Sequence, residues 1–166
     1  MTHLPPAGPQ TGPLPGAPSV AGQVSVGRLM TAPPVTVAPD VTLAGATRLM
    51  AETAVGSLLV VADGTLLGIV TDRDLALRGL GEGLPLDSRI DAVMSPRVVT
   101  LDAGDEIHEA YRTFRRTGVR RLPVLDDGRP VGVLTLDDLL LDVFRRLADL
   151  LGPVAWSVLR EPPGPQ

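Results

Sequence analysis

An internal duplication is the feature that most constrains this chain. The stretch Gly68-Ile69-Val70-Thr71-Asp72-Arg73-Asp74 returns 64 positions later as Gly132-Val133-Leu134-Thr135-Leu136-Asp137-Asp138. Aligned without gaps, residues 26–75 and 90–139 are identical at 15 of 50 positions, where ordinary amino-acid usage gives about three by chance. A repeat of this length is one supersecondary unit that buries too little alone, so the two copies are expected to pack together.

Each copy shows the same order of local patterns. A short helical turn is followed by an extended segment, at residues 35–37 or 98–101, and then by an amphipathic helix. Two apolar runs come next, joined by an Asp-Gly pair that is a strong hairpin signal. The order β-α-β-β-α in each copy predicts an α+β fold with pseudo-two-fold symmetry. The predicted helices cover residues 42–53, 71–79, 105–117 and 136–151.

Changes in composition divide the chain into five parts. Residues 1–22 are rich in Pro and Gly and predict a disordered tail. The first repeat is assigned to residues 23–80, a linker to 81–89 and the second repeat to 90–151. Residues 152–166 form a C-terminal extension, and Gly152-Pro153 at its start is expected to stop or kink the preceding helix.

Composition also removes several classes of function. The chain has no cysteine and two histidines, His3 and His108, so a thiolate metal site is excluded and a His-based zinc site or catalytic triad is hard to build. The net charge of −4 argues against nucleic-acid binding. No apolar run reaches the roughly 18 residues of a membrane span. Residues 1–24 do not resemble a secretory signal, so a cytoplasmic location is expected.

The repeats resemble a known family. Each ends in the pattern apolar-Gly-apolar-apolar-Thr-x-x-Asp, and they begin with Leu29-Met30-Thr31 and Val93-Met94-Ser95. The second copy also carries Arg121-Leu122-Pro123-Val124 before its Asp-Gly turn. Over residues 24–145 the chain is similar to the cystathionine β-synthase (CBS) domain pair, also called a Bateman module, and specifically to its stand-alone bacterial type.

The resemblance implies a regulatory module with no catalytic residues, no metal and no required cofactor. Its regulatory ligand would contain adenosine, as AMP, ADP, ATP, S-adenosylmethionine or NAD do, and would bind in clefts between the repeats. The resemblance also implies a homodimer that pairs through the amphipathic helices, and a protein partner that the module regulates. The nucleotide-binding residues that it implies are Thr36, Gly56, Ser57, Thr71, Arg73, Asp74, Thr100, Arg120, Arg121, Pro123, Thr135 and Asp138.

Particular roles follow from the same resemblance. The Asp of Thr-x-x-Asp accepts hydrogen bonds from ribose hydroxyls in the family, a role that falls to Asp74 and Asp138. A carboxylate suits this role because its two oxygens accept from two vicinal hydroxyls. Thr71 and Thr135 are expected to donate to phosphate. The extended segments expected to contact the adenine edge are those around Thr36 and Thr100.

The two copies differ where phosphate is expected. Arg120-Arg121 in the second copy aligns with Gly56-Ser57 in the first. Arginine binds phosphate oxygens through two parallel N–H donors, which glycine and serine cannot do. The cleft of Asp138 is therefore expected to suit charged phosphates better, and Arg73 is a candidate phosphate contact for either cleft.

Two alternatives remain open. Thr-x-x-Asp before an apolar helix is also a capping box, so Thr71 with Asp74, and Thr135 with Asp138, have a local role that needs no ligand. A ligand-free dimerisation module with vestigial clefts is therefore the alternative function. An enzyme is disfavoured, because the two Asp residues occupy equivalent places in separate repeats and predict two similar sites rather than one composite site.

Overall fold

The computed structural model describes residues 24–160 and the side chains of residues 24–152. The predicted disordered tail, residues 1–22, and the side chain of Trp156 lie outside this range. None of the helices within residues 24–160 combines the length and hydropathy that spanning a membrane requires. The elements are α1 (Val26–Leu29), β1 (Thr36–Val37), α2 (Leu43–Thr53), β2 (Ser57–Ala62), β3 (Thr65–Thr71), α3 (Asp72–Asp74), β4 (Leu101–Asp102), α4 (Ile107–Thr117), β5 (Arg121–Asp126), β6 (Arg129–Thr135) and α5 (Leu136–Arg160).

Each repeat forms its own three-stranded sheet, in the order β1-β2-β3 or β4-β5-β6. The first pair of strands is parallel and the second antiparallel, and the register Val37↔Val60 recurs at the equivalent pair Leu101↔Val124. Both hairpins turn at the predicted Asp-Gly pair, where all four residues have positive φ angles between 47° and 76°. Such angles define the type I′ turn that matches the twist of the strands. The α+β prediction is confirmed.

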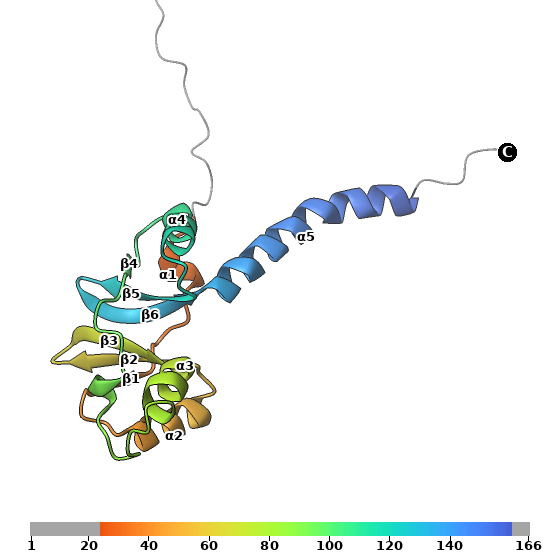
Figure 1. Ribbon diagram of the computed structural model, residues 1–166. Coiled ribbons are helices and arrows are strands. Elements are labelled where there is room, and N and C mark those ends of the chain that lie inside the picture. Colours follow the sequence, from red (N-terminus) through yellow and green to blue (C-terminus); the bar gives the residue numbers. More distant parts are fainter. Residues whose placement is uncertain (1–23, 161–166) are drawn as a thin grey trace, which may run out of the picture.

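The two sheets lie face to face between outer layers of helices (Figure 1). Helices α2 and α3 cover the first sheet, and α1 and α4 cover the second. Each sheet has its own aliphatic core, centred on Leu58 and Val60 in one repeat and on Leu122 and Val124 in the other. Strands β3 and β6 make the contact between the sheets. The central strands are therefore covered on both faces.

The short turn at the start of each repeat packs on the other repeat. Val26 is completely buried in the second core, and its N–H donates to the Asp105 carbonyl at 2.9 Å. Ile90, in a 3₁₀ turn at Ile90–Ala92, is completely buried in the first core and its N–H donates to the Val41 carbonyl at 2.7 Å. Each repeat thus contributes a residue to the core of the other repeat, which holds the two repeats together.

Residues 30–31 and 94–95, which follow the short turn at the start of each repeat, pass directly over Gly132 and Gly68. Ser95 and Ile69 exchange backbone hydrogen bonds of 2.8 and 3.1 Å across Gly68. A Cβ atom on Gly68 would lie 2.6 Å from the Ser95 carbonyl oxygen. The equivalent Gly132 faces Met30 and the Thr31 carbonyl oxygen in the same way. Glycine is required at position 68 because the backbone of Ser95 occupies the place of a side chain, whereas the nearest atoms at position 132 belong to the Met30 side chain.

The helices after the Thr-x-x-Asp motifs differ between the repeats. In the first, α3 continues as a π-helical turn at Leu75–Leu80. In the second, α5 runs from Leu136 to Arg160, so Gly152-Pro153 does not stop the helix, and the alternative that it kinks the helix stays a prediction. Proline removes one backbone donor but fits a helix whose freed carbonyl reaches solvent, and Asp149, four residues earlier, is exposed. Helix α5 extends away from the sheets (Figure 1).

Candidate functional site

A cleft of about 450 Å³ lies where the first repeat's Thr-x-x-Asp motif meets the second repeat. This volume falls within the range of small-molecule sites. The cleft brings together the end of β3, the start of α3, the crossing segment after residue 94 and the junction between α4 and β5. Its lining residues are Ile69, Thr71, Arg73, Asp74, Ser95, Arg97, Val98, Val99, Gly118, Val119, Arg120 and Arg121.

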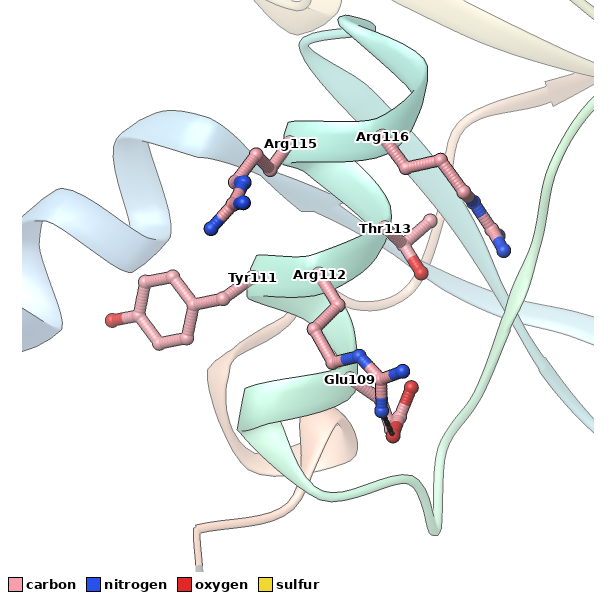
Figure 2. Close-up of a pocket in the computed structure, with 6 residues that line it drawn as sticks. All are labelled: Glu109, Tyr111, Arg112, Thr113, Arg115 and Arg116. Atoms are coloured by element: carbon pink, nitrogen blue, oxygen red, sulfur yellow. Dashed lines mark hydrogen bonds and ion pairs between the residues drawn. The ribbon is translucent and has the colours of Figure 1, made fainter.

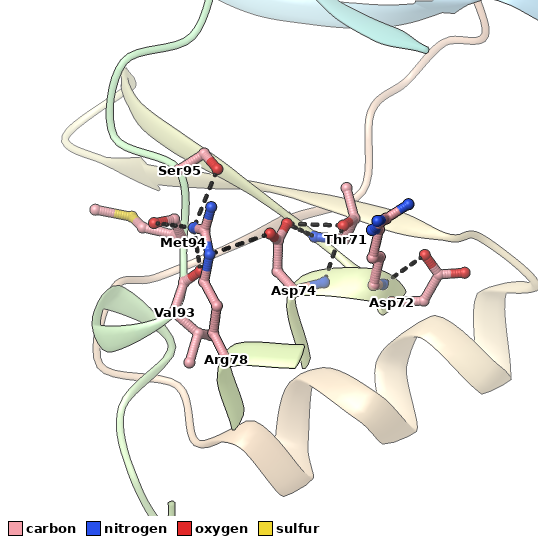
Figure 3. Close-up of polar contacts among 8 residues, drawn as sticks. Thr71, Asp72, Asp74, Arg78, Val93, Met94 and Ser95 are labelled. Carbon is pink, nitrogen blue, oxygen red and sulfur yellow. Dashed lines mark hydrogen bonds and ion pairs between the residues drawn. The ribbon is translucent and has the colours of Figure 1, made fainter. Parts of the chain in front are cut away.

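Thr71 and Asp74 form a complete capping box at the edge of this cleft (Figure 3). The Asp74 N–H donates to Thr71 Oγ1 at 3.2 Å, and Asp74 Oδ2 accepts from the Thr71 N–H at 2.9 Å and from its hydroxyl at 2.7 Å. The hydroxyl's single proton is therefore committed to Asp74. A bond from Thr71 to phosphate, as predicted, would require its hydroxyl to turn away from Asp74.

The second oxygen of Asp74 faces Arg78. Asp74 Oδ1 lies 3.6 Å from Arg78 Nε, and Arg78 Nη1 donates to the carbonyls of Val93 and Met94 and to Ser95 Oγ at 3.0–3.3 Å (Figure 3). Arg78 thus joins the helix after the motif to the segment that crosses from one repeat to the other. The long Arg78 contact leaves Asp74 Oδ1 able to accept further hydrogen bonds, although the Asp74 side chain is only 16% exposed.

Four arginines of the cleft come from three separate segments. Arg73 lies in α3 and Arg97 in the crossing segment, while Arg120 and Arg121 follow Val119, the residue after the left-handed C-cap of α4. Within the described residues none of these four guanidinium groups lies within 4.0 Å of a carboxylate. Unneutralised positive charge in a cleft favours an anionic ligand.

The placement of Arg120 and Arg121 corrects a prediction. They were expected beside Asp138, in their own repeat, but they line the cleft of Asp74. Arg121 Nη2 reaches across to Gly56, where an added Cβ would lie only 2.7 Å away. The alignment shows which repeat an arginine belongs to, whereas the packing of the two repeats decides which motif its side chain faces.

The second motif has the same local geometry. Asp138 Oδ2 accepts from the Thr135 N–H at 2.8 Å and from its hydroxyl at 2.7 Å, and the Asp138 N–H donates to Thr135 Oγ1 at 3.1 Å. The hydroxyl of Thr135 is therefore committed in the same way as that of Thr71. The capping interpretation accounts for the local hydrogen bonds of both motifs.

Other predicted site residues lie away from the Asp74 cleft. Thr36 is an exposed residue of β1, and Thr100 lines a separate hollow of about 210 Å³ near the Gly128 turn. Pro123 is completely buried in β5, so the expectation that it contacts a ligand is wrong. Burial follows because both faces of this strand are covered. Arg97 and Ser95 line the cleft but were missed, because a crossing segment carries no periodic pattern.

A second hollow, of about 550 Å³, runs along α4 (Figure 2). Its described lining comes from that helix alone, and Arg112 there is paired with Glu109 at 3.0 Å. Tyr111 points toward α5 in Figure 2, and burial together with the nearby Asp142 raises the pKa of its hydroxyl, although Arg146 opposes this. The smaller cleft is the better candidate site because its walls come from both repeats and its arginines are unpaired.

Comparison with known proteins agrees with this architecture. The family model of the CBS domain matches residues 26–80 and 90–144. The CBS domain-containing protein YhcV of Bacillus subtilis is 36% identical over 115 residues, which cover 69% of this chain and 82% of that protein.

Solved structures show the same arrangement. An uncharacterized conserved protein from Pyrococcus horikoshii matches with a TM-score of 0.68 and 30% identity, over 73% of this chain and 92% of the other. The CBS domain protein PAE2072 from Pyrobaculum aerophilum, complexed with AMP, matches with a TM-score of 0.65 and 27% identity, over 70% and 90%. Sequence, fold and repeat organisation therefore agree: the chain belongs to the CBS domain family and carries two tandem copies of the domain.

Proposed function

We propose that this CBS pair is a regulatory module that binds an adenosine-containing ligand in the cleft of Asp74. One observation carries the proposal: a carboxylate with a free acceptor oxygen and four unpaired arginines, drawn from both repeats, meet in a single cleft. A relative of the same fold, PAE2072, has been solved with AMP, which supports this class of ligand.

The residues suggest how the ligand is held. Asp74 Oδ1 accepts from the ribose hydroxyls, while Oδ2 stays engaged with Thr71 and fixes the carboxylate's orientation. The arginines bind phosphate oxygens through charge-assisted hydrogen bonds. Binding, without turnover, is the proposed role, because the hydroxyl–carboxylate pair in the cleft, Thr71 with Asp74, forms the cap of α3.

Binding in this cleft couples the two repeats. The ligand joins the start of α3 in one repeat to the α4–β5 junction in the other, so the relative position of these elements changes the affinity. A ligand shifts an equilibrium only by its differential affinity for two states. The module passes this shift to a protein partner or to its own dimer interface, and a cytoplasmic location is proposed with it.

The test is calorimetric titration of the full chain with AMP, ADP, ATP, S-adenosylmethionine and NADH. Asp74→Asn is expected to weaken binding at least tenfold by removing an acceptor from the ribose, as expected for a lost charged hydrogen bond. Asp138→Asn makes the same change in the other capping box and is the matched control for the loss of the cap. Binding of no ligand at millimolar concentration, or equal losses in both variants, would support the ligand-free alternative.

We also propose that the chain is a homodimer, paired through α5. Leu140, Val143, Leu147 and Leu150 alternate at spacings of three and four residues, the seam of a helix–helix pair. They and neighbouring apolar residues such as Phe144, which is 64% exposed, present roughly 700 Å² of apolar surface, near the roughly 800 Å² that each partner of a stable dimer buries.

A second copy is the occupant that fits this face. Helix α5 carries four aspartates and three arginines, whereas helices that lie on lipid surfaces carry an excess of basic residues. Analytical ultracentrifugation at micromolar concentration should show a dimer, which Phe144→Asp converts to monomer. Arg145→Asp changes charge on the opposite face and should leave the dimer intact. A monomeric wild-type chain, or a dimer that survives Phe144→Asp, contradicts the proposal.

A further inference from the structure

We infer that the arginines around Asp74, which the other repeat's motif lacks, select one adenosine ligand per chain with at least two phosphate groups. This rests on the proposed function and narrows its ligand class. The alignment of the repeats together with the structure carries it. Each arginine around Asp74 has a non-basic counterpart around Asp138, and the aligned pairs are Arg73/Asp137, Arg78/Asp142, Arg97/Pro33, Arg120/Gly56 and Arg121/Ser57.

The first cleft is strongly cationic. Arg78 is opposed by Asp74, but Arg73, Arg97, Arg120 and Arg121 have no carboxylate within 4.0 Å among the described residues. A further acid close to these arginines is Asp72, since a Cβ on Gly56 would lie 3.2 Å from its Oδ2 and 2.7 Å from Arg121 Nη2. Its single charge leaves a clear excess of positive charge at this end of the cleft.

This excess defines the ligand. Each guanidinium can donate two parallel hydrogen bonds to phosphate oxygens. Four guanidinium groups together offer more donors than the single phosphate of a nucleoside monophosphate can accept when its ribose is bound at Asp74. Two or three phosphates in a chain supply both the oxygens and the negative charge. Adenosine itself supplies neither, and the sulfonium of S-adenosylmethionine adds repulsion. A nucleoside diphosphate or triphosphate is therefore the class that the cleft selects.

The Asp138 motif lacks this excess of positive charge. The aspartates at 137 and 138 begin α5, and Asp142 follows one turn later, where its only described ion-pair partner is Arg146 on the same helix, at 2.7 Å. Gly56 and Ser57 themselves carry no charge, although Arg121 Nη2 would lie 2.7 Å from a Cβ on Gly56. Because Arg146 neutralises Asp142, the carboxylates that disfavour phosphates beside this motif are those of Asp137 and Asp138. One bound nucleotide per chain is the expected stoichiometry.

The experiment is titration calorimetry of the full chain with adenosine, AMP, ADP and ATP, repeated at two salt concentrations. ADP and ATP should bind at least tenfold more tightly than AMP, with one site per chain and a marked loss of affinity at high salt. Arg120→Gln and Arg73→Gln should each weaken ATP binding about tenfold or more, as expected for a lost charged hydrogen bond, and should change adenosine binding little. Arg112→Gln, an exposed arginine outside the cleft, is the matched control.

The outcomes distinguish a failure of the proposed function from a failure of the inference about phosphate number. If no adenosine compound binds, the proposed function fails. If adenosine or AMP binds as tightly as ATP, if two sites fill, or if Arg120→Gln behaves like Arg112→Gln, the function stands and the charge inference is overturned. Inorganic tripolyphosphate should displace ATP from the wild-type chain, and its failure to compete also overturns the inference.

Discussion

Replacing Gly68 by alanine tests how the two repeats are held together. The new Cβ would lie 2.6 Å from the carbonyl oxygen of Ser95 and 3.0 Å from the sulfur of Met94. The sulfur belongs to a flexible side chain and can move, but the oxygen belongs to backbone that is itself hydrogen-bonded to Ile69. The crossing segment must therefore shift away from β3, and the two backbone bonds between Ile69 and Ser95 lengthen or break.

The expected cost follows from these contacts. Overpacking a well-packed position costs about 1–3 kcal/mol, and two net backbone hydrogen bonds contribute about 0.5–1.5 kcal/mol each. Alanine also restricts the unfolded chain, which offsets the loss by about 0.4–1 kcal/mol. Together these predict that Gly68→Ala lowers the free energy of unfolding by about 3 kcal/mol and Tm by roughly 6–12 °C.

Urea denaturation followed by circular dichroism measures this difference. Gly79→Ala is the control, because the nearest atom to its new Cβ is a methyl carbon of Leu43 at 3.4 Å, an ordinary contact. Gly132→Ala should fall between the two, since it faces the flexible Met30 side chain and a carbonyl oxygen at 3.0 Å. A Gly68→Ala variant within 1 kcal/mol of wild type (about one third of the cost reasoned from overpacking and lost bonds) would refute the argument that backbone fills this position.

Two further predictions concern the second repeat. Thr135→Val removes the hydroxyl that both accepts from and donates to Asp138, and should lower the free energy of unfolding by about 1 kcal/mol in urea melts; no change would show that the capping box contributes nothing. The chain's only tyrosine, Tyr111, has a pKa raised above 10.0 by burial and then by Asp142. A raised folded-state pKa contributes stability below pH 10 that is lost as the pH rises through that pKa. Absorbance titration should therefore give a midpoint above 10.0, and Asp142→Asn should move it part of the way down; an unchanged midpoint would show that Asp142 does not act on Tyr111.

Much of the fold follows from local patterns. The Asp-Gly pairs favour the tight turn of a hairpin, so both hairpins could be predicted directly, whereas the register shifts at Val60–Val61 and Val124–Leu125 could not. Gly118 was recognisable as a helix C-cap because it follows an amphipathic stretch. The end of α5 could not be predicted, because proline's effect depends on whether the freed carbonyl is buried or reaches solvent, which sequence alone does not show.

Only some residues of the candidate site could be predicted from the sequence. The duplicated Thr-x-x-Asp motif identified Thr71 and Asp74, but the motif does not reveal that the threonine hydroxyl is already bonded to the aspartate. Arg97 escaped notice because it lies in a connecting segment with no periodicity. Arg120 was predicted to lie beside Asp138 and lines the cleft of Asp74 instead. An alignment of the repeats compares positions and contains no information about contacts between the repeats.

What the sequence alone determined is the duplication, the order of elements within each copy and the difference in charge between the copies. These are properties of neighbouring residues, set by steric and hydrogen-bonding preferences that act over a few positions. The tertiary structure decided how the copies combine: Val26 and Ile90 each complete the other repeat's core, and arginines of the second repeat line the cleft of the first. Those arrangements depend on long-range packing, in which residues far apart in the chain must fill one volume together.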